Sequence, residues 1–502
     1  MFALADHPIA IEKLPNTQTK RQKSGLSPCQ SSQAISNTDC KTLFRHPLGL
    51  KPSGNLYEDF YRGRKCIRGK SLGPFFTALP DEQLLLILSM LNASDLLFFG
   101  TCSRAFYVLC SHDELWRALV LEELNGGFSI QKTWKSSYIC TKAGTTQWKI
   151  AKIQVPGLYS DVFFQSFYCA QTPIRAEWLC VETLDRIDAS SLPMSKFTEL
   201  YDIRNRPVIL KNATTHWPAL KKWTSDSYLI QTCQEKTLNA GGYAFTIENY
   251  LKYCRTLRDD QPLCIFDKDF AAKIPSLALD YDVPQYFQHD LGALLGQEFR
   301  PDYRWLIIGP ERSGSTFHID PNATNAWNAV IKGAKKWILF PPKCTPPGVF
   351  PSEDQSVVST PISLMEWFLT FYAEIGKLPP HQRPLEGICR AGEVVYVPHG
   401  WWHLVLNIEE SIAITQNFIS VGNVKSVLRF LSEKPDQVSG CAHEIRPKLS
   451  SMLKELLMQH EPTLMAQIEK EMRTSEEKRS QWGNVLKDQS FNFSFQFEEA
   501  VR

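Results

Sequence analysis

From residue 206 onward, the chain contains a series of short segments that are rich in β-branched and aromatic residues and bounded by proline or glycine. The clearest of them are Arg206–Leu210, Tyr303–Ile308, Lys336–Phe340, Glu393–Val397 and Ser411–Thr415. Runs of this length and composition are typical of β-strands. Because they are many, short and separated by long insertions, they predict a β-sandwich or a barrel.

Helical periodicity flanks this region on both sides. Upstream, Leu79-Pro80 is followed by acidic residues that suit a helix N-terminus and by leucines at helical spacing. The pattern predicts three helices: the first begins at Asp81, and the others are Asp95–Phe106 and Asp113–Leu121, with Trp116 pointing inward. Downstream, the periodic segments Val424–Leu431, Ile445–Leu457 and Leu464–Trp482 predict a C-terminal helical bundle.

The basic character of the chain is concentrated in its first 70 residues. This polar segment has 12 Lys and Arg against 5 Asp and Glu, a formal charge of +7, whereas the whole chain carries +2. The remainder is therefore acidic, which excludes a protein that coats nucleic acid over its whole surface. A basic arm can still assist contact with nucleic acid, and Lys20, Arg21 and Lys23 form a small cluster that fits nuclear import.

Cysteine usage and hydropathy indicate a soluble protein of a reducing compartment. The 14 cysteines are scattered and include no C-x-x-C pair, so a disulfide framework is not expected. No apolar run approaches the roughly 20 residues that are needed to cross a bilayer. We therefore expect a protein of the nucleus, and also of the cytoplasm, with no membrane partner.

The most informative short motif is His318-Ile319-Asp320, which His403 follows 85 residues later. On a strand, residues i and i+2 face the same side, so His318 and Asp320 can both reach one metal ion. Two imidazoles and one carboxylate make the facial triad of non-heme iron(II), which leaves positions open for a co-substrate and dioxygen. The tripeptide alone is weak evidence, because a surface histidine beside an aspartate is commoner than a metal site.

The context of the motif adds to its weight. The relevant segments are Arg304-Trp-Leu-Ile-Ile-Gly-Pro310, Arg312-Ser-Gly-Ser-Thr-Phe-His-Ile-Asp-Pro321, Ala326-Trp-Asn-Ala329, Lys335-Lys-Trp337, Gly392-Glu393, Gly400-Trp-Trp-His-Leu-Val-Leu-Asn407 and Ala413-Ile-Thr-Gln-Asn-Phe418, with Arg255-Thr-Leu-Arg-Asp-Asp260 and Ile265-Phe-Asp267 upstream. Over residues 200–435 this series resembles the Jumonji C (JmjC) domain oxygenases, and among them the group of the lysyl hydroxylase once described as a phosphatidylserine receptor. The resemblance implies a double-stranded β-helix of the cupin, or jelly-roll, type in a chain of the α+β class.

The resemblance also implies roles for individual residues. His318, Asp320 and His403 would be the ligands of Fe(II), and Lys335 would form an ion pair with the distal carboxylate of the co-substrate 2-oxoglutarate. A buried carboxylate needs such a counter-charge. Lys336, one residue further along a strand, should face outward. The other residues implied to contact the co-substrate or to line its pocket are Thr415, Asn328, Ser315, Asn407 and Asn417.

Two positions depart from the family pattern. Cys264 stands where the related hydroxylase has a tyrosine that helps to hold 2-oxoglutarate, and Ser315 replaces a threonine near the metal. Serine keeps a hydroxyl group, whereas a thiol is a weak hydrogen-bond donor. We therefore expect 2-oxoglutarate to bind more weakly than in that relative, but still to bind.

The three predicted helices between residues 75 and 124 resemble an F-box, whose family role is to dock onto the adaptor subunit of cullin ubiquitin ligases. The alternative is a helical cap that only packs on the barrel. The predicted organisation is then a disordered basic arm (1–70), an F-box-like module (71–125), an irregular connector packed on the barrel (126–190), the JmjC barrel (191–422) and a C-terminal helical region (423–502).

The function implied is that of an Fe(II)- and 2-oxoglutarate-dependent oxygenase that uses O2 to oxidise protein side chains and releases succinate and CO2. Lysyl hydroxylation is favoured, and N-methyl demethylation of histones comes second; Lys- or Arg-rich proteins such as histone tails are the expected substrates. The alternative from another class is an F-box substrate receptor whose barrel only binds its target. The sequence does not identify the substrate.

Overall fold

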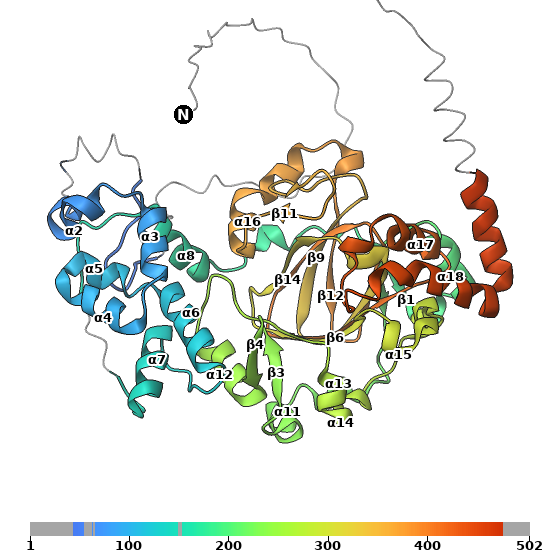
Figure 1. Cartoon of the computed structure of the whole chain (residues 1–502), viewed down its shortest axis with the longest axis horizontal. Coiled ribbons are helices and arrows are strands. Elements are labelled where there is room, and N and C mark those ends of the chain that lie inside the picture. Colours follow the sequence, from blue (N-terminus) through green and yellow to red (C-terminus); the bar gives the residue numbers. More distant parts are fainter. Residues whose placement is uncertain (1–43, 55–62, 64–65, 149–152, 475–502) are drawn as a thin grey trace, which may run out of the picture. The chain divides into compact units, whose positions relative to one another are not determined.

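The computed structural model describes residues 44–54, 63, 66–148 and 153–474 (Figure 1). The predicted nuclear-import cluster Lys20, Arg21 and Lys23 lies outside the described residues, as does most of the predicted basic arm. The described residues from Arg45 onward form one compact unit. No helix of the described part is both long and apolar enough to span a membrane.

Two β-sheets form the centre of this unit. The larger sheet has the strand order β1-β2-β13-β8-β15-β6-β5-β3-β4, and the smaller has the order β12-β9-β14-β7. The strands are β1 Arg186–Asp188, β2 Val208–Lys211, β3 Thr237–Ala240, β4 Tyr243–Thr246, β5 Ile265–Asp267, β6 Arg304–Gly309, β7 Gly314–His318, β8 Asn325–Lys332, β9 Ala334–Phe340, β12 Leu385–Arg390, β13 Val394–Val397, β14 Trp402–Asn407 and β15 Ser411–Phe418. The predicted double-stranded β-helix is confirmed.

A small apolar core joins the inner faces of the two sheets. Val330 and Val395 of the large sheet share a buried cluster with Trp337, Leu339 and Val405 of the small one. The alternation that this requires is seen along β14, where His403, Val405 and Asn407 are spaced two residues apart and so point to the same side. The inner face therefore carries apolar packing in its middle and polar residues toward its ends.

The outer faces of both sheets are also covered. On the small sheet, Phe340 and Leu404 pack against Met365 and Trp367 of helix α16 (Leu364–Thr370). On the large sheet, Ile308 and Ile414 belong to the main core, which continues into the helices that precede the barrel. Strands buried on both faces explain why the sequence shows nearly continuous apolar runs instead of strict alternation.

The helical module before the barrel differs in detail from its prediction. It comprises α2 Arg68–Thr77, α3 Asp81–Ser89, α4 Ala93–Cys102, α5 Arg104–Leu109 and α6 Asp113–Leu124. The predicted second helix is two helices, because Ser103 has an extended backbone and its hydroxyl accepts the Phe106 amide as the cap of α5. Trp116 is fully buried as predicted, and its indole N–H donates to the Cys110 carbonyl.

Two segments that were predicted to lack regular structure contain folded parts. The segment 126–190 is not mainly irregular, since it contains α7 (Trp134–Ala143) and α8 (Asp161–Gln171), whose N-caps are Thr133 and Ser160. Residues 44–54 of the predicted arm are folded: Leu50 is buried and Lys51 pairs with Tyr159 in a parallel bridge. This segment has too few apolar residues to fold alone, so contacts with a distant part of the chain order it.

The C-terminal region is helical, as its periodicity predicts. Helices α17 (Val424–Glu433) and α18 (Leu449–His460) lie side by side, drawn in red in Figure 1, and share a core that includes Leu428 and Leu453. A further helical segment covers 462–474, and the rest of the predicted third helix lies outside the described residues.

Candidate iron site and co-substrate pocket

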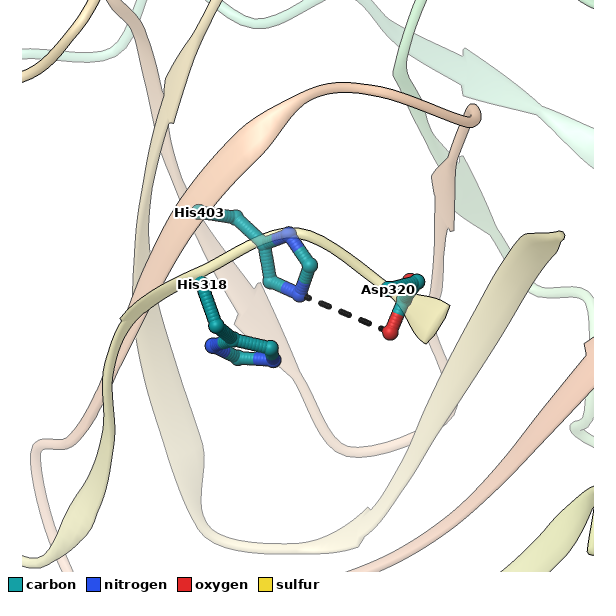
Figure 2. Close-up of side chains that lie close together, drawn as sticks. All are labelled: His318, Asp320 and His403. Atoms are coloured by element: carbon teal, nitrogen blue, oxygen red, sulfur yellow. Dashed lines mark ion pairs between the residues drawn. The ribbon is translucent and has the colours of Figure 1, made fainter. Parts of the chain in front are cut away.

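The structure brings His318, Asp320 and His403 together, as the sequence predicts. His318 is the last residue of β7 and pairs in register with His403 of β14. Asp320 lies just past the end of β7, in an extended conformation before a short 3-10 helix, and not on the strand itself. One ligand atom from each residue lies within 4.8 Å of the other two (Figure 2).

Hydrogen bonds to the backbone fix the tautomers of both imidazoles. The Nδ1 atom of His318 lies 2.8 Å from the Thr316 carbonyl oxygen, and Nδ1 of His403 lies 3.0 Å from the Trp401 carbonyl oxygen. A carbonyl can only accept, so Nδ1 carries the proton in each ring. Each Nε2 then presents its lone pair, which is the state that a metal ion requires.

The Asp320 carboxylate fits a cation between the rings. Its Oδ1 lies 4.0 Å from His403 Nε2, which is too long for a hydrogen bond, and its Oδ2 is buried without any hydrogen-bond partner. Burial raises the pKa of Asp320 to about 6 and lowers that of His403 well below its ordinary value. A divalent cation offsets both effects because it satisfies the carboxylate and binds neutral imidazole. These residues therefore fit iron(II).

Lys335 is a buried cation that has no carboxylate partner among the described residues. It lies on β9 opposite Asn407 of β14 and has only 2% of its surface exposed. Burial lowers the pKa of its ammonium group to about 8, and no ion pair or hydrogen bond offsets that burial within the described part of the chain. A protein keeps such a group where an anion binds to it. The position therefore fits the distal carboxylate of 2-oxoglutarate.

The other predicted pocket residues lie on strands β7 and β14 of the small sheet and on β8 and β15 of the large one. Asn328 and Thr415 face each other across β8 and β15; the Asn328 Oδ1 is buried without a partner, whereas the Thr415 hydroxyl donates to the Trp327 carbonyl at 2.9 Å. Asn407 is fully buried and donates to the Ser313 hydroxyl at 2.8 Å. Ser315 is half-buried on β7.

Asn417 lies close enough to Asp320 to lower the pKa of its carboxyl, against the larger effect of burial. Its amide also donates to the Thr324 hydroxyl at 2.8 Å. Asn417 was predicted to line the pocket, and the structure places it beside the metal ligand Asp320.

The neighbouring residue Lys336 faces the opposite side of the sheet from Lys335, as predicted, but that side is not exposed to solvent. It is fully buried there, where its Nζ lies 2.8 Å from a Glu386 carboxylate oxygen and donates to the Val181 carbonyl. The outer face of β9 is covered by other segments, which the sequence of the strand does not reveal. Lys335 and Lys336 are therefore both buried, but within the described part of the chain only Lys336 has an acidic partner.

Cys264 lies near the co-substrate end of the pocket. Its sulfur, the Ser313 hydroxyl and the Asn407 amide crowd around Gly309, where an added Cβ would overlap all three. Lys335 is close enough to act on the pKa of the Cys264 thiol, which burial raises. The weaker binding of 2-oxoglutarate stays a prediction. Cys264 does lie near Lys335, the residue that is predicted to bind the co-substrate.

A pocket of about 410 Å³ opens beside His318. Its walls are formed by Asp260, Gln261, Pro262, Arg312, Ser313, Gly314, Ser315, Thr316, Ile362 and Leu364. Sequence reasoning assigned no role to Asp260 or Arg312, although both lie in segments that carry the family resemblance. Their place in the pocket depends on loops from three distant parts of the chain, and no local pattern marks it.

Comparison with known proteins agrees with this geometry. The model of the family "JmjC domain, hydroxylase" matches residues 305–418, and an F-box-like family model matches residues 76–122. Arginine-specific demethylase JMJ22 of Arabidopsis thaliana is 42% identical to this chain over 89% of the chain and 88% of its own length. The chain belongs to the JmjC hydroxylase family. The predicted recognition of this family and of an F-box-like module is confirmed.

Two other JmjC relatives extend the comparison. Lysine-specific demethylase JMJ21 of Arabidopsis thaliana is 34% identical over 72% of this chain and 38% of its own length. Bifunctional arginine demethylase and lysyl-hydroxylase psr-1 of Caenorhabditis elegans is 35% identical over 57% of this chain and 70% of its own length. As a JmjC hydroxylase the chain is an oxygenase, and its donor set agrees with the predicted cofactor iron(II) and co-substrate 2-oxoglutarate.

Proposed function

We propose that this JmjC protein oxidises cationic side chains of protein substrates, with 2-oxoglutarate and O2 as co-substrates and Fe(II) held by His318, Asp320 and His403. The observation that carries the proposal is a metal triad together with a buried lysine that lacks an acidic partner among the residues that the structure describes. A barrel that only binds its target would gain nothing from an unpaired buried cation, which is destabilising. The pure substrate-receptor alternative is therefore disfavoured.

Each residue has a definite task in this scheme. Bound iron supplies the activation of dioxygen. The backbone carbonyls of Thr316 and Trp401 keep Nε2 of both histidines deprotonated and oriented. Lys335 neutralises the distal carboxylate of 2-oxoglutarate, and the apolar inner core around Trp337 and Val405 excludes water from that end of the pocket. Substrate enters through the pocket beside His318.

Arginine demethylation is the favoured reaction, ahead of lysyl hydroxylation. The relative that shares 88% of its own length with this chain is named an arginine-specific demethylase, and psr-1 is named for both activities. In either reaction 2-oxoglutarate and O2 yield succinate and CO2 while one oxygen atom enters a C–H bond of the substrate. At an N-methyl carbon the product loses formaldehyde and leaves N–H, whereas at a side-chain carbon the alcohol remains.

Mass spectrometry of peptides separates these outcomes. The purified chain is incubated with Fe(II), 2-oxoglutarate and histone-tail peptides that carry dimethylarginine, arginine or lysine, and succinate and formaldehyde are measured. Loss of a methyl group with formaldehyde release indicates demethylation, and gain of one oxygen atom indicates hydroxylation. His318→Ala must abolish both products. Absence of peptide-dependent succinate from every peptide would refute the proposed function.

A second function is supported by the surface of the helical module. Leu86 and Met90 on or next to α3 and Phe98 on α4 are 62%, 79% and 68% exposed, which is unusual for large apolar side chains. We propose that this surface binds the adaptor subunit of a cullin ubiquitin ligase. The test is a pull-down with purified adaptor, in which Leu86→Asp should lose binding and the exposed control Glu82→Gln should not. Binding that survives Leu86→Asp would contradict this assignment.

We further propose a nuclear location, with a cytoplasmic fraction, and a contact of the basic N-terminal arm with nucleic acid. Both rest on the charge of the sequence alone. Imaging of a tagged chain with Lys20, Arg21 and Lys23 all changed to alanine tests the location. Unchanged nuclear signal would remove the support for this cluster.

A further inference from the structure

The wall of the pocket beside His318 contains a carboxylate, Asp260, that has no role in the proposed reaction so far as His318, Asp320, His403 and Lys335 account for it. Asp260 lines the pocket together with the polar residues Gln261 and Thr316 and the apolar residues Ile362 and Leu364. Because His318 lies in the same pocket, a substrate side chain that reaches the metal passes these walls. The pocket combines apolar surface for an aliphatic stem with polar groups for its end.

The Asp260 carboxylate has one oxygen without a hydrogen-bond partner in the part of the chain that the structure describes. This oxygen, Oδ1, is buried, and no cation lies within ion-pair distance among the described residues. Burial raises the pKa of Asp260 to about 6; a hydrogen bond with the Ser363 side chain opposes this rise, and the carboxylates of Glu114 and Glu366 add to it. A cation in the pocket would relieve this burial and repulsion.

The one guanidinium in the pocket wall does not fill this role. Arg312 is buried, and it directs its N–H groups at the backbone carbonyls of Asp259 and Cys169. It lowers the pKa of Asp260 only as a lesser effect, and it makes no ion pair with it. Arg312 thus holds segments of the pocket wall together, while Asp260 keeps an unpaired oxygen.

The segment that carries Asp260 is held rigidly by the helices in front of the barrel. The neighbouring Asp259 accepts hydrogen bonds from the Trp134 indole and the Tyr253 hydroxyl, both at 2.8 Å. Arg117 of α6 donates to the Gln261 carbonyl at 3.0 Å and lies 3.7 Å from the Asp259 carboxylate. A preorganised carboxylate of this kind binds a cation with less loss of entropy than a flexible one.

We propose that Asp260 forms the ion pair that holds the ammonium or guanidinium group of the substrate residue in the pocket beside His318. This inference rests on the proposed function, because it names the group that recognises the cationic substrate. Arginine and lysine have the required charge on an aliphatic stem. A guanidinium can engage the carboxylate and the polar wall at once, which makes arginine the better fit.

Equilibrium binding tests this role without turnover. Fluorescein-labelled Gly-Ser decapeptides with a central arginine or lysine are titrated by anisotropy against the full chain, loaded anaerobically with Mn(II) and 2-oxoglutarate. The matched neutral peptides carry citrulline in place of arginine or norleucine in place of lysine. The variants are Asp260→Asn, the conservative Asp260→Glu and the control Glu353→Gln, which removes an exposed carboxylate elsewhere.

The native chain should prefer the charged peptide over the matched neutral peptide by on the order of 30-fold, the typical effect of removing one member of a desolvated charge pair. The preference should vanish in Asp260→Asn, return at least partly in Asp260→Glu and stay in Glu353→Gln. A preference that survives Asp260→Asn, or none in the native chain, overturns the assignment. Charge preference without succinate release from any peptide would instead refute the proposed function alone.

Discussion

Replacement of Lys335 by methionine should make the protein more stable and its co-substrate site weaker. Methionine has a similar length and no charge, so it can occupy the same buried position on β9 without a counter-ion. Most substitutions of a fully buried side chain are destabilising. The opposite sign is expected here because the native lysine is maintained for a ligand that the free protein does not contain.

The size of the effect follows from the pKa of Lys335. Burial lowers it from 10.5 to about 8, which corresponds to roughly 3 kcal/mol of unfavourable free energy for the charged form. At pH 7 the folded and unfolded chains are both protonated at this lysine, so Lys335→Met should raise the free energy of unfolding by about 1–3 kcal/mol. Between pH 8 and 10.5 the unfolded chain binds more protons than the folded chain, so native stability rises with pH and the gain of the variant shrinks.

The same substitution should weaken 2-oxoglutarate binding by a factor of about 100 or more, because it removes one member of a buried ion pair. Stability is measured by urea denaturation of the metal-free protein. Affinity is measured by anaerobic titration of the iron-loaded protein, with the metal-to-ligand charge-transfer absorption as the signal.

Lys336→Met is the matched control from the same strand. Lys336 is equally buried but paired with Glu386, so its removal leaves an uncompensated carboxylate and should destabilise the fold by about 3–5 kcal/mol. It should leave 2-oxoglutarate affinity in the folded fraction unchanged. Should Lys335→Met destabilise the protein while co-substrate affinity stays the same, Lys335 is a structural residue and the assignment of the pocket is wrong.

Three further outcomes are expected. Gly314→Ala should destabilise the protein by about 3 kcal/mol or more in urea denaturation. The reason is that Gly314 has a φ of +150° and that an added Cβ would overlap the Val405 carbonyl of β14. Near-native stability of this variant would contradict the tight approach of β7 and β14. Arg117→Ala should raise KM for a peptide substrate about tenfold and leave 2-oxoglutarate affinity unchanged, because Arg117 supports the pocket wall at Gln261. An unchanged KM would show that the pocket wall does not need this support. The apparent affinity for 2-oxoglutarate should fall about tenfold per pH unit above pH 8, because Lys335 loses its proton there. Lys335→Arg should abolish this pH dependence because arginine stays charged. A flat pH profile in the native protein would argue against an ionic contact between Lys335 and 2-oxoglutarate.

The strands and the metal ligands were predictable because their signals are local or lie in short motifs. All five apolar runs that were singled out contain strands of the two sheets. His318 and Asp320 are two residues apart, and an extended backbone is enough to direct both toward one ion. His403 could be added only through the family resemblance, since its pairing with His318 across β7 and β14 joins residues that are 85 positions apart.

Features that depend on neighbours from elsewhere in the chain were not predictable. The family resemblance distinguished Lys335 from Lys336, but nothing in the sequence showed that Lys336 is buried and paired with Glu386. The break at Ser103 was missed because the apolar periodicity continues across it. Asp260 was missed because its place in the pocket depends on strand β7, which contains Ser315, and on the segment around Ile362.

The sequence alone determined the class of fold and two of the metal ligands, because strand periodicity and the spacing of His318 and Asp320 are properties of short segments, and its longer motifs identified the family and with it His403. The tertiary structure decided which charges are buried, which of them are paired and which side chains share a pocket. Burial and pairing depend on atoms brought from distant positions, and the free energy of a buried charge is set by those surroundings and not by its own residue type.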